Sequence, residues 1–477
     1  MDDRTPRTDR QLTGVTDMDE TLFQPAVDAA RMLSRKEISS RELTEMMLAR
    51  IDAVNPLLNA VVELRPEAAL WEAAAADEAI ARGAGAGPLH GVPVTIKDAF
   101  DVAGLHTTWG NPAFKDFVAD RDATVARRLQ QAGAIIVGKT NVAFMLGDFG
   151  QTANDLYGVT NNPWDTTRTP GGSSGGAAAA LSAGMTFLEY GSDLVGSIRI
   201  PASFCGVYGL KPTAGIVPLT GFQPPGSPAG PSEMSYMSAA GPLARSAGDL
   251  RTALSVTAGP DDEAAKACSW TLPPPRHTRL QDFRVGVVLD HPQAPVSSEV
   301  TALMSTTVDA LARAGATIAE GWPDGVDPVA SSESFGFHVQ LFFAFTQPGA
   351  DFATLCQVID QEARRMAARA AWNRYFNNID VFLCPVNFTP AFTHDARPFE
   401  ERTITTPEGE RPYNNQPFWI SHASLPGLPA VAAPIGRTPG GLPVGVQIVG
   451  PRYEDDTAIT FAELLADVTG GYEPPPL

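Results

Sequence analysis

Residues 91–98 read Gly-Val-Pro-Val-Thr-Ile-Lys-Asp, and their apolar run predicts a buried β-strand that ends at Lys97. A helical pattern follows from Asp122 to Ala132, with Gly133 as its stop signal. Residues 134–137, Ala-Ile-Ile-Val, form a second and wholly apolar strand. A strand, a helix and a buried strand in this order favour parallel pairing in a sheet covered on both faces, so the predicted fold class is α/β.

Alternating strands and helices extend this pattern over the rest of the chain. A Ser-x-x-Glu capping box at residues 39–42 and an alanine-rich helix at residues 67–82 come before the first strand. Further strands are expected at Phe283–Leu289, Thr317–Ala319, Val381–Cys384, Ala430–Ala433 and Val444–Ile448, and helices at Ser297–Ala314 and Phe352–Phe376. Residues 221–231 and 258–275 are interpreted as surface loops, because sheet-like sequence resumes after each. These patterns predict a flexible N-terminal arm at residues 1–20 and a single domain at residues 21–477.

The composition is that of an acidic globular protein. Its 477 residues carry 54 Asp and Glu against 35 Lys and Arg, a formal net charge of −19, so nucleic acids and anionic membranes are poor default partners. Hydrophobic residues make up 44%, which supports a large buried core. The N-terminus lacks the features of a secretory signal, and no stretch is apolar enough to span a bilayer. The expected location is the cytoplasm, where the four scattered cysteines stay reduced and serve as packing residues.

Two pattern matches are rejected. Residues 133–140 satisfy the phosphate-loop expression, but their middle is a buried strand, whereas a phosphate cradle needs exposed backbone. Residues 171–175 satisfy the Gly-x-Ser-x-Gly expression, but prolines stand where a nucleophile elbow requires a strand. The seven histidines include none with a distinctive setting, and His90 and His422 are expected to bond loop backbone. The sequence contains no metal-ligand motif.

Lys97 is the strongest candidate for a catalytic base. It ends an apolar strand, where desolvation disfavours the ammonium form and allows the neutral amine to act near physiological pH. Asp98 need not neutralise it, because adjacent residues on a strand point to opposite faces. If the strand stood alone, a lysine that reaches out to solvent would be the simpler interpretation.

Two glycine-rich serine loops argue against that simpler interpretation. Residues 171–176 read Gly-Gly-Ser-Ser-Gly-Gly, and residues 191–201 read Gly-Ser-Asp-Leu-Val-Gly-Ser-Ile-Arg-Ile-Pro. The second loop follows an apolar run and places Ser197 at a tight turn, where backbone N–H groups can converge on one developing oxyanion. In isolation, Ser197 is equally well explained as a helix cap.

At these motifs the chain resembles the amidase signature family of serine hydrolases. The matching segments, in family order, are residues 91–98, 171–176, 197–202 and 209–213. The resemblance extends from about Ala29 to Asp456 and is weakest across residues 260–410. It implies a large mixed β-sheet core covered on both faces by α-helices, with catalytic motifs at residues 88–216, a variable substrate-pocket region at about 220–425, and no cofactor.

The resemblance also implies the roles of the site residues. Ser197 corresponds to the nucleophile, Ser173 to the bridging serine and Lys97 to the base of a Ser-Ser-Lys triad. The family's bridging serine follows a cis peptide, which here is Gly172–Ser173. The implied oxyanion hole consists of four backbone N–H groups, those of Leu194, Val195, Gly196 and Ser197. The family usually has glycine at the position of Val195, so either the turn is in an ordinary conformation there or the hole is altered.

The predicted function is hydrolysis of the C–N bond of a small or medium organic amide through a serine acyl-enzyme, with aryl amides, carbamates and esters as variants. Candidate pocket walls are Met145, Phe149, Leu156 and Phe204. Two alternatives are a glutamine-dependent amidotransferase of the A type, working within a complex, and a non-catalytic binding protein. The expected partner is a small-molecule amide, with no nucleic acid, membrane, metal or cofactor, and a homodimer is left open.

Overall fold

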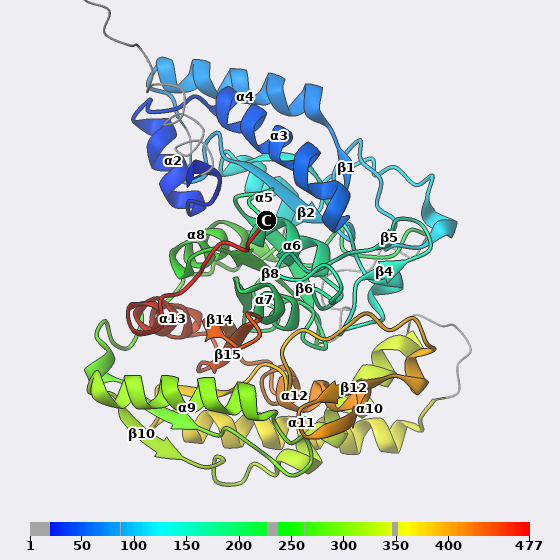
Figure 1. The fold of residues 1–477 in the computed structure, drawn as a ribbon, viewed down its shortest axis with the longest axis vertical. Helices are drawn as coiled ribbons and strands as arrows, with labels where there is room; N and C mark the ends of the chain where they lie inside the picture. The colour runs from blue at the N-terminus through cyan, green and yellow to red at the C-terminus, as the bar shows by residue number, and fades with distance from the viewer. Residues whose placement is uncertain (1–19, 86, 227–236, 262, 346–351) are drawn as a thin grey trace, which may run out of the picture.

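The computed structural model describes residues 20–477 except 86, 227–236, 262 and 346–351 (Figure 1). The predicted N-terminal arm lies outside these residues apart from Glu20. The predicted surface loop at 221–231 is described only up to residue 226.

An eight-stranded mixed sheet forms the centre of the molecule, in the order β10-β9-β11-β15-β14-β7-β8-β6. Its strands are β6 (Glu189–Asp193), β7 (Tyr208–Lys211), β8 (Ala239–Ala244), β9 (Arg284–Val287), β10 (Thr317–Glu320), β11 (Val381–Pro385), β14 (Ala430–Arg437) and β15 (Pro443–Val449). Strand β9 pairs in parallel with β10 and β11, and the other pairs are antiparallel. All the strands expected after residue 280 are present in this sheet, and helices cover both of its faces, which confirms the α/β prediction.

A smaller, three-stranded sheet has the order β1-β3-β2, with β1 (Val61–Leu64), β3 (Ile135–Thr140) and β2 (Pro93–Lys97). Strands β2 and β3 pair in parallel, as the sequence predicts, and β1 adds an antiparallel strand that was not identified from the sequence. Residues 138–140 continue β3, and a Cβ atom on Gly138 would lie 2.1 Å from the carbonyl oxygen of Glu63. This segment is therefore a packed strand and not a phosphate-binding loop.

The helices fall into three groups along the long axis of the molecule (Figure 1). At one end lie α2 (Ala26–Ser34), α3 (Ser40–Leu58) and α4 (Pro66–Ala81), and at the other end α9 (Ser298–Arg313), α10 (Pro328–Phe345) and α11 (Leu355–Tyr375). Between them are α5 (Thr124–Gln131), α6 (Gly175–Ser182), α7 (Arg199–Cys205), α8 (Ala247–Thr257) and α13 (Asp455–Thr469), whereas α12 (Pro417–Ser424) lies against α10. The predicted capping box is present at the start of α3, where Ser39 and Glu42 exchange hydrogen bonds. Every residue of α6 and α7 is buried, so the two helices that follow the serine loops are anchored in the core.

Two short hairpins lie outside both sheets. They are formed by β4 (Ala153–Asn154) with β5 (Gly158–Val159), and by β12 (Thr403–Thr406) with β13 (Gly409–Pro412). None of the helices in the described part of the chain is both long and apolar enough to cross a bilayer.

The four cysteines are free thiols, as expected, but only two of them pack in the core. Cys205 and Cys384 are buried, whereas Cys268 and Cys356 are exposed. The expectation that all four serve as packing residues is wrong for these last two, which lie in a loop and on the solvent side of α11.

Candidate active site

Lys97 lies at the point where the two sheets approach each other. Strand β2 ends at this residue, and its side chain is fully buried. Its Nζ atom lies 2.8 Å from Ser173 Oγ, 2.8 Å from Ser174 Oγ and 3.0 Å from Ser192 Oγ. Ser173 and Ser174 come from the loop before α6, and Ser192 comes from β6 of the large sheet. One amine is thus surrounded by hydroxyl groups that lie 76 to 95 residues further along the chain.

Burial lowers the pKa of Lys97 to about 7. The charges of Asp193 and Glu189 act in the opposite direction and favour the ammonium form. A neutral amine has two hydrogens and one lone pair, so with three hydroxyl neighbours it donates two hydrogen bonds and accepts the third at Nζ. Near neutral pH, Lys97 is therefore able to accept a serine proton.

Asp98 takes no part in this cluster. Its carboxylate accepts hydrogen bonds from the backbone and side chain of Thr108 and lies 3.7 Å from Lys139 Nζ. Lys139, also buried, donates to two backbone carbonyl oxygens, those of Phe100 and His106. The two neighbours at the end of β2 therefore point to opposite sides, as the strand geometry predicts.

The loop that carries Ser173 is packed too tightly for side chains at its glycines. A Cβ atom on Gly172 would lie 2.2 Å from the carbonyl oxygen of Gln151, and one on Gly176 would lie 2.5 Å from the backbone nitrogen of Asn141. The Gly172–Ser173 peptide bond is cis, as the family resemblance implies. At the next residue, Ser174 N–H donates to the carbonyl oxygen of Ser197 at 3.2 Å, so the two serine loops lie against each other.

Ser197 occupies the turn between β6 and α7. Gly196 has φ of 84°, in the left-handed region, whereas Val195 is not in that region, so this valine fits the turn in an ordinary conformation. The Gly196 N–H donates to Asp193 Oδ1 at 2.9 Å. The N–H groups of Leu194, Val195 and Ser197 have no hydrogen-bond partner among the described residues, and these three residues line a pocket that Gly196 does not reach.

The turn is braced from behind by a buried ion pair. Arg199 Nη2 lies 2.7 Å from Asp193 Oδ1, and both side chains are completely buried. Burial alone would raise the pKa of Asp193, but the charge and hydrogen bonds of Arg199, together with the charge of Lys211 and the Ile198 N–H, hold this pKa below its usual value. Arg199 also donates to Gln447 Oε1 at 2.6 Å and Ser424 Oγ at 2.7 Å, which ties the turn to β15 and α12.

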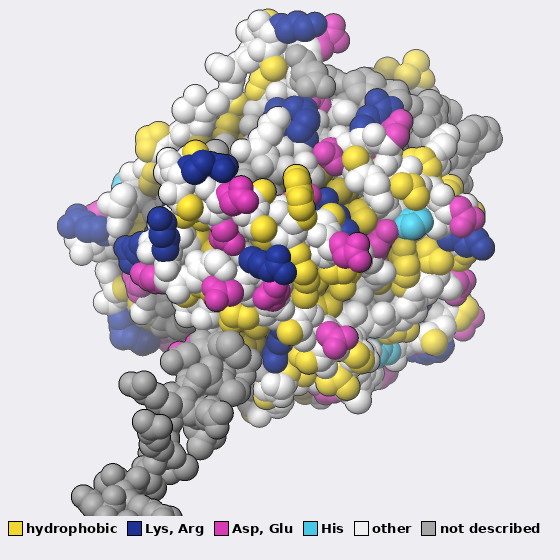
Figure 2. Space-filling model, turned by 90° about the horizontal axis from the view of Figure 1, so that it is seen from above, with side chains coloured by type: hydrophobic (Ala, Val, Ile, Leu, Met, Phe, Trp, Pro, Cys, Tyr) yellow, Lys and Arg dark blue, Asp and Glu magenta, His cyan; other side chains and the backbone are white. Residues whose placement is uncertain are grey.

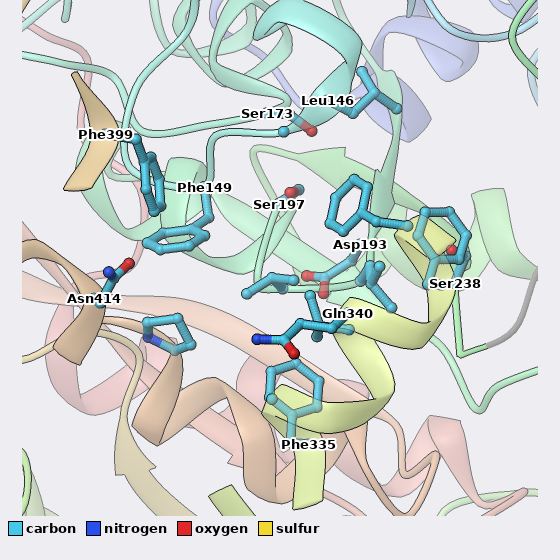
Figure 3. Close-up of a pocket in the computed structure, with 18 of the residues that line it drawn as sticks. Leu146, Phe149, Ser173, Asp193, Ser197, Ser238, Phe335, Gln340, Phe399 and Asn414 are labelled. Atoms are coloured by element: carbon cyan, nitrogen blue, oxygen red, sulfur yellow. The ribbon is translucent and has the colours of Figure 1, made fainter. Parts of the chain in front are cut away.

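The serines open into a cavity of about 710 Å³ (Figure 3). Ser173, Ser192 and Ser197 line it. Much of its wall is aromatic and includes Phe149, Phe222, Phe335, Phe342, Phe399 and Phe418. Among the described residues of the lining, none is a lysine, an arginine or a histidine, and the carboxylates are Asp193, which pairs with Arg199, and the exposed Glu400.

The structure brings two of the four predicted pocket residues to this cavity. Met145 and Phe149 line it. Phe204 does not, because it faces the core from α7 and packs edge-on against Phe392 at 5.8 Å. Leu156 lies in the turn between β4 and β5, away from the lining. The wall that α10 supplies lies within the expected substrate-pocket region at about 220–425, but its lining residues were not identified individually, since it falls where the family resemblance is weakest.

Two neighbours of Lys97 were also missed at the level of sequence. Ser174 and Ser192 both stand inside quoted motifs, and the run of hydroxyl residues there is the signal that identifies them.

His422 was expected to bond loop backbone, but it is buried against Trp322 and Phe418 with neither ring nitrogen hydrogen-bonded to a described residue. His90 contacts a backbone oxygen at 3.2 Å, but it is that of Ala76 in helix α4 and not one in a loop. In the described residues no group of three or more His, Cys, Asp or Glu side chains is placed to hold a metal ion.

Comparison with known proteins identifies relatives over almost the whole chain. A family model described as Amidase matches residues 42–347 and 326–459. The A subunit of the glutamyl-tRNA(Gln) amidotransferase of Methylococcus capsulatus strain Bath is 32% identical, covering 93% of this chain and 96% of the relative. Indoleacetamide hydrolase of Bradyrhizobium diazoefficiens is 34% identical, and the match covers 93% of this chain and 86% of that relative. A solved structure described as a vestigial protein complex related to an s-triazine catabolic enzyme superposes with a TM-score of 0.80 at 28% identity, covering 94% of this chain and 100% of that chain.

The protonation of Lys97 can be measured without any substrate, because the chain has only six lysines: Lys36, Lys97, Lys115, Lys139, Lys211 and Lys266. In protein labelled with ¹³C at lysine Cε, the Lys97 signal should titrate with a midpoint near 7, since burial disfavours its charge. Lys97→Met should remove that signal, and Lys115→Met, at an exposed position, should leave it in place. A Lys97 midpoint near the ordinary value of 10.5 would contradict the conclusion that burial lowers the pKa of this amine.

Proposed function

The chain belongs to the amidase signature family of hydrolases, and we propose that it hydrolyses an uncharged, apolar amide through an acyl-enzyme formed on Ser197. The observation that carries this proposal is the contact of buried Lys97 with Ser173, which lines an apolar cavity together with Ser197. A neutral amine next to a chain of hydroxyls is the arrangement that general base catalysis requires.

In the proposed reaction, the Ser197 oxygen attacks the acyl carbon while its proton passes to Ser173 and a Ser173 proton passes to Lys97 Nζ. The C–N bond then breaks, and the same relay returns a proton to the leaving nitrogen, because an amide departs poorly as an anion. Water attacks the ester on Ser197 and releases the acid. Ser197 Oγ forms no hydrogen bond to a described residue, and contacts between a nucleophile and its proton acceptor commonly tighten only when substrate binds.

The proposed oxyanion hole is formed by the backbone N–H groups of Leu194, Val195 and Ser197. All three residues line the cavity, and their N–H groups are unoccupied by described residues. The Gly196 N–H donates instead to Asp193 Oδ1, and this hydrogen bond stabilises the turn. A single donor of this kind contributes about 3 kcal/mol of transition-state stabilisation.

The lining of the cavity supports an uncharged and partly aromatic substrate. A cavity of about 710 Å³ lies within the usual range for small organic ligands. No lysine or arginine among its described lining residues offers a partner to a carboxylate, and an unpaired carboxylate is costly to remove from water. Esters and carbamates of similar shape fit the same acyl-transfer chemistry.

The second candidate function is that of an amidotransferase component that takes ammonia from glutamine in a complex. It is favoured by the 32% identity to the A subunit of a glutamyl-tRNA(Gln) amidotransferase. It is disfavoured by the cavity, since glutamine carries an α-carboxylate. On the face shown in Figure 2, Lys and Arg side chains alternate with Asp and Glu side chains, and no continuous basic patch suited to RNA is visible there.

Ser197→Ala removes the attacking oxygen, so amide turnover should fall by about 10⁴-fold or more and labelling by a fluorophosphonate should disappear. Ser255→Ala is a matched control, because that hydroxyl is exposed on α8 and bonds only within its own helix. Unchanged labelling of Ser197→Ala would show that a different residue is the nucleophile.

A substrate panel distinguishes the two candidate functions. Purified chain should hydrolyse a neutral anilide at least about tenfold faster, in kcat/KM, than the same anilide with a carboxylate on its acyl group, because the carboxylate finds no counter-ion. Glutamine should not be hydrolysed. Glutaminase activity above the anilide rate, or activity that depends on added partner subunits, would select the amidotransferase.

A further inference from the structure

A turn at residues 148–152 packs directly against the loop that carries Ser173. The polar contacts between them are Phe149 O with Gly172 N (3.0 Å), Gly150 O with Thr169 Oγ1 (2.8 Å), and Thr152 Oγ1 with Gly171 O (2.8 Å) and Gly175 N (3.0 Å). A Cβ atom on Gly172 would lie within 2.5 Å of the carbonyl oxygens of both Asp148 and Gln151. The turn therefore determines where Gly172, and with it Ser173, can lie.

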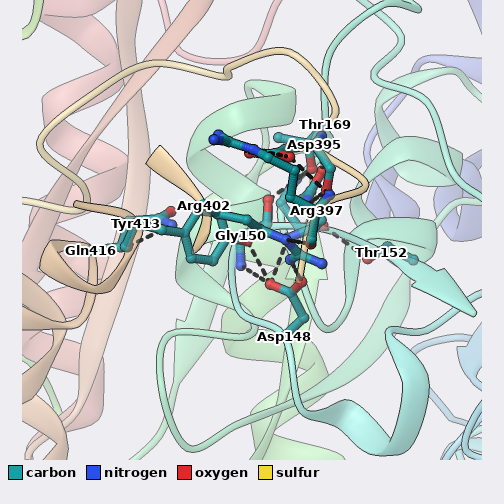
Figure 4. Close-up of polar contacts among 11 residues, drawn as sticks. Asp148, Gly150, Thr152, Thr169, Asp395, Arg397, Arg402, Tyr413 and Gln416 are labelled. Carbon is teal, nitrogen blue, oxygen red and sulfur yellow. Dashed lines mark hydrogen bonds and ion pairs between the residues drawn. The ribbon is translucent and has the colours of Figure 1, made fainter. Parts of the chain in front are cut away.

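The carboxylate of Asp148 holds this turn together (Figure 4). Its Oδ1 atom accepts the N–H groups of Gly150 at 3.0 Å and Gln151 at 3.2 Å, and the hydroxyl of Tyr413 at 2.6 Å. Its Oδ2 atom pairs with Arg402 Nη1 at 2.5 Å. Both Asp148 and Arg402 are largely shielded from solvent, with side chains 19% and 15% exposed, so this contact is screened far less than a surface ion pair.

Arg402 and Tyr413 flank the β12–β13 hairpin, one on each side. The guanidinium of Arg402 also lies over the Tyr413 ring, 5.4 Å from its centroid. Gln151 adds two hydrogen bonds to the backbone of Asp395, just before the hairpin. Since the hairpin belongs to neither sheet, these side-chain contacts directly link its flanking residues to the turn at 148–152, which in turn packs against the Ser173 loop.

The same segment supplies part of the cavity wall. Phe399 lines the cavity, and so does Phe149 from the turn. The Phe149 ring stacks on Tyr413 with centroids 5.6 Å apart and meets Phe399 edge-on at 5.6 Å. One group of contacts thus spans the substrate cavity and the loop of the bridging serine.

We propose that Arg402 and Tyr413 are positioning residues for Ser173. Through Asp148 they fix the turn at 148–152, and the turn fixes the loop that holds the Ser173 hydroxyl against Lys97. The inference rests on the proposed function, because it takes Ser173 to be the proton relay. Neither Arg402 nor Tyr413 lines the cavity around Ser197, so their effect reaches the reaction through Ser173 and not through substrate contact.

Loss of this positioning should slow the cleavage of amides more than that of activated esters. An amide nitrogen must be protonated as it leaves, and this proton comes through Ser173, whereas an activated ester releases a stable anion that needs no proton. A Ser173 hydroxyl that is displaced slows both reactions, but it slows amide cleavage more. A simple loss of folded protein would slow both equally.

The test compares Arg402→Gln and Tyr413→Phe with the unmodified chain on an anilide and a 4-nitrophenyl ester of the same acyl group. Each variant should lower the amide-to-ester ratio of kcat/KM by about tenfold or more, mainly through kcat. Arg402→Lys, which retains the charge, should recover part of the ratio. Tyr413→Phe keeps the ring stack on Phe149 and is the variant least able to disturb folding.

Arg397→Gln is the matched control, because it removes the ion pair with Asp395 and a hydrogen bond to Thr403 Oγ1 from the same segment, and the Arg397 side chain has no hydrogen bond to the turn. The amide-to-ester ratio of kcat/KM in Arg397→Gln should stay within about twofold of the ratio in the unmodified chain. Suppose that thermal melting shows Arg402→Gln and Tyr413→Phe to be folded and that both keep the amide-to-ester ratio of the unmodified chain. That result would overturn the positioning role alone. An unmodified chain that cleaves neither compound would overturn the proposed function, and the positioning role with it.

Discussion

The arrangement of this site depends on the burial of one lysine amine. Lys97 ends a strand of the small sheet, and its Nζ atom has no exposed surface through which water could stabilise the ammonium ion. Its hydrogen-bond partners are serine hydroxyls, which solvate charge poorly compared with water and carry no negative charge of their own. The same burial that lowers the pKa to about 7 also holds the amine in place, so a base of suitable strength arises from packing.

The neighbouring structure keeps this amine free to act. Asp98, the carboxylate nearest in sequence, is bound to Thr108 and lies beside Lys139 on the other side of the strand. Asp193, which favours the ammonium form, is neutralised by Arg199 in a buried pair that also shapes the nucleophile turn. The carboxylates of Asp98 and Asp193 are thus engaged in contacts that hold the loops around Lys97.

Local motifs predicted the centre of the site, and contacts between distant segments determined its periphery. The strand that ends at Lys97 and the two serine loops were recognisable because each depends on a few adjacent residues, such as the glycines that allow close backbone approach. The aromatic side chains of α10 that line the cavity were not recognisable individually, since nothing in residues 328–345 shows which side of the helix will face Ser197. Phe204 was assigned to the pocket because it follows the nucleophile closely, but a helix turns it toward the core.

The central claim is that neutral Lys97 activates Ser197, and the rate at which a fluorophosphonate labels Ser197 as a function of pH tests it most directly. This rate should rise through a midpoint near 7, as Lys97 loses its proton, and the rise should disappear in Lys97→Met. The same midpoint and a comparable rate in Lys97→Met would contradict the claim, because another group would then be accepting the proton.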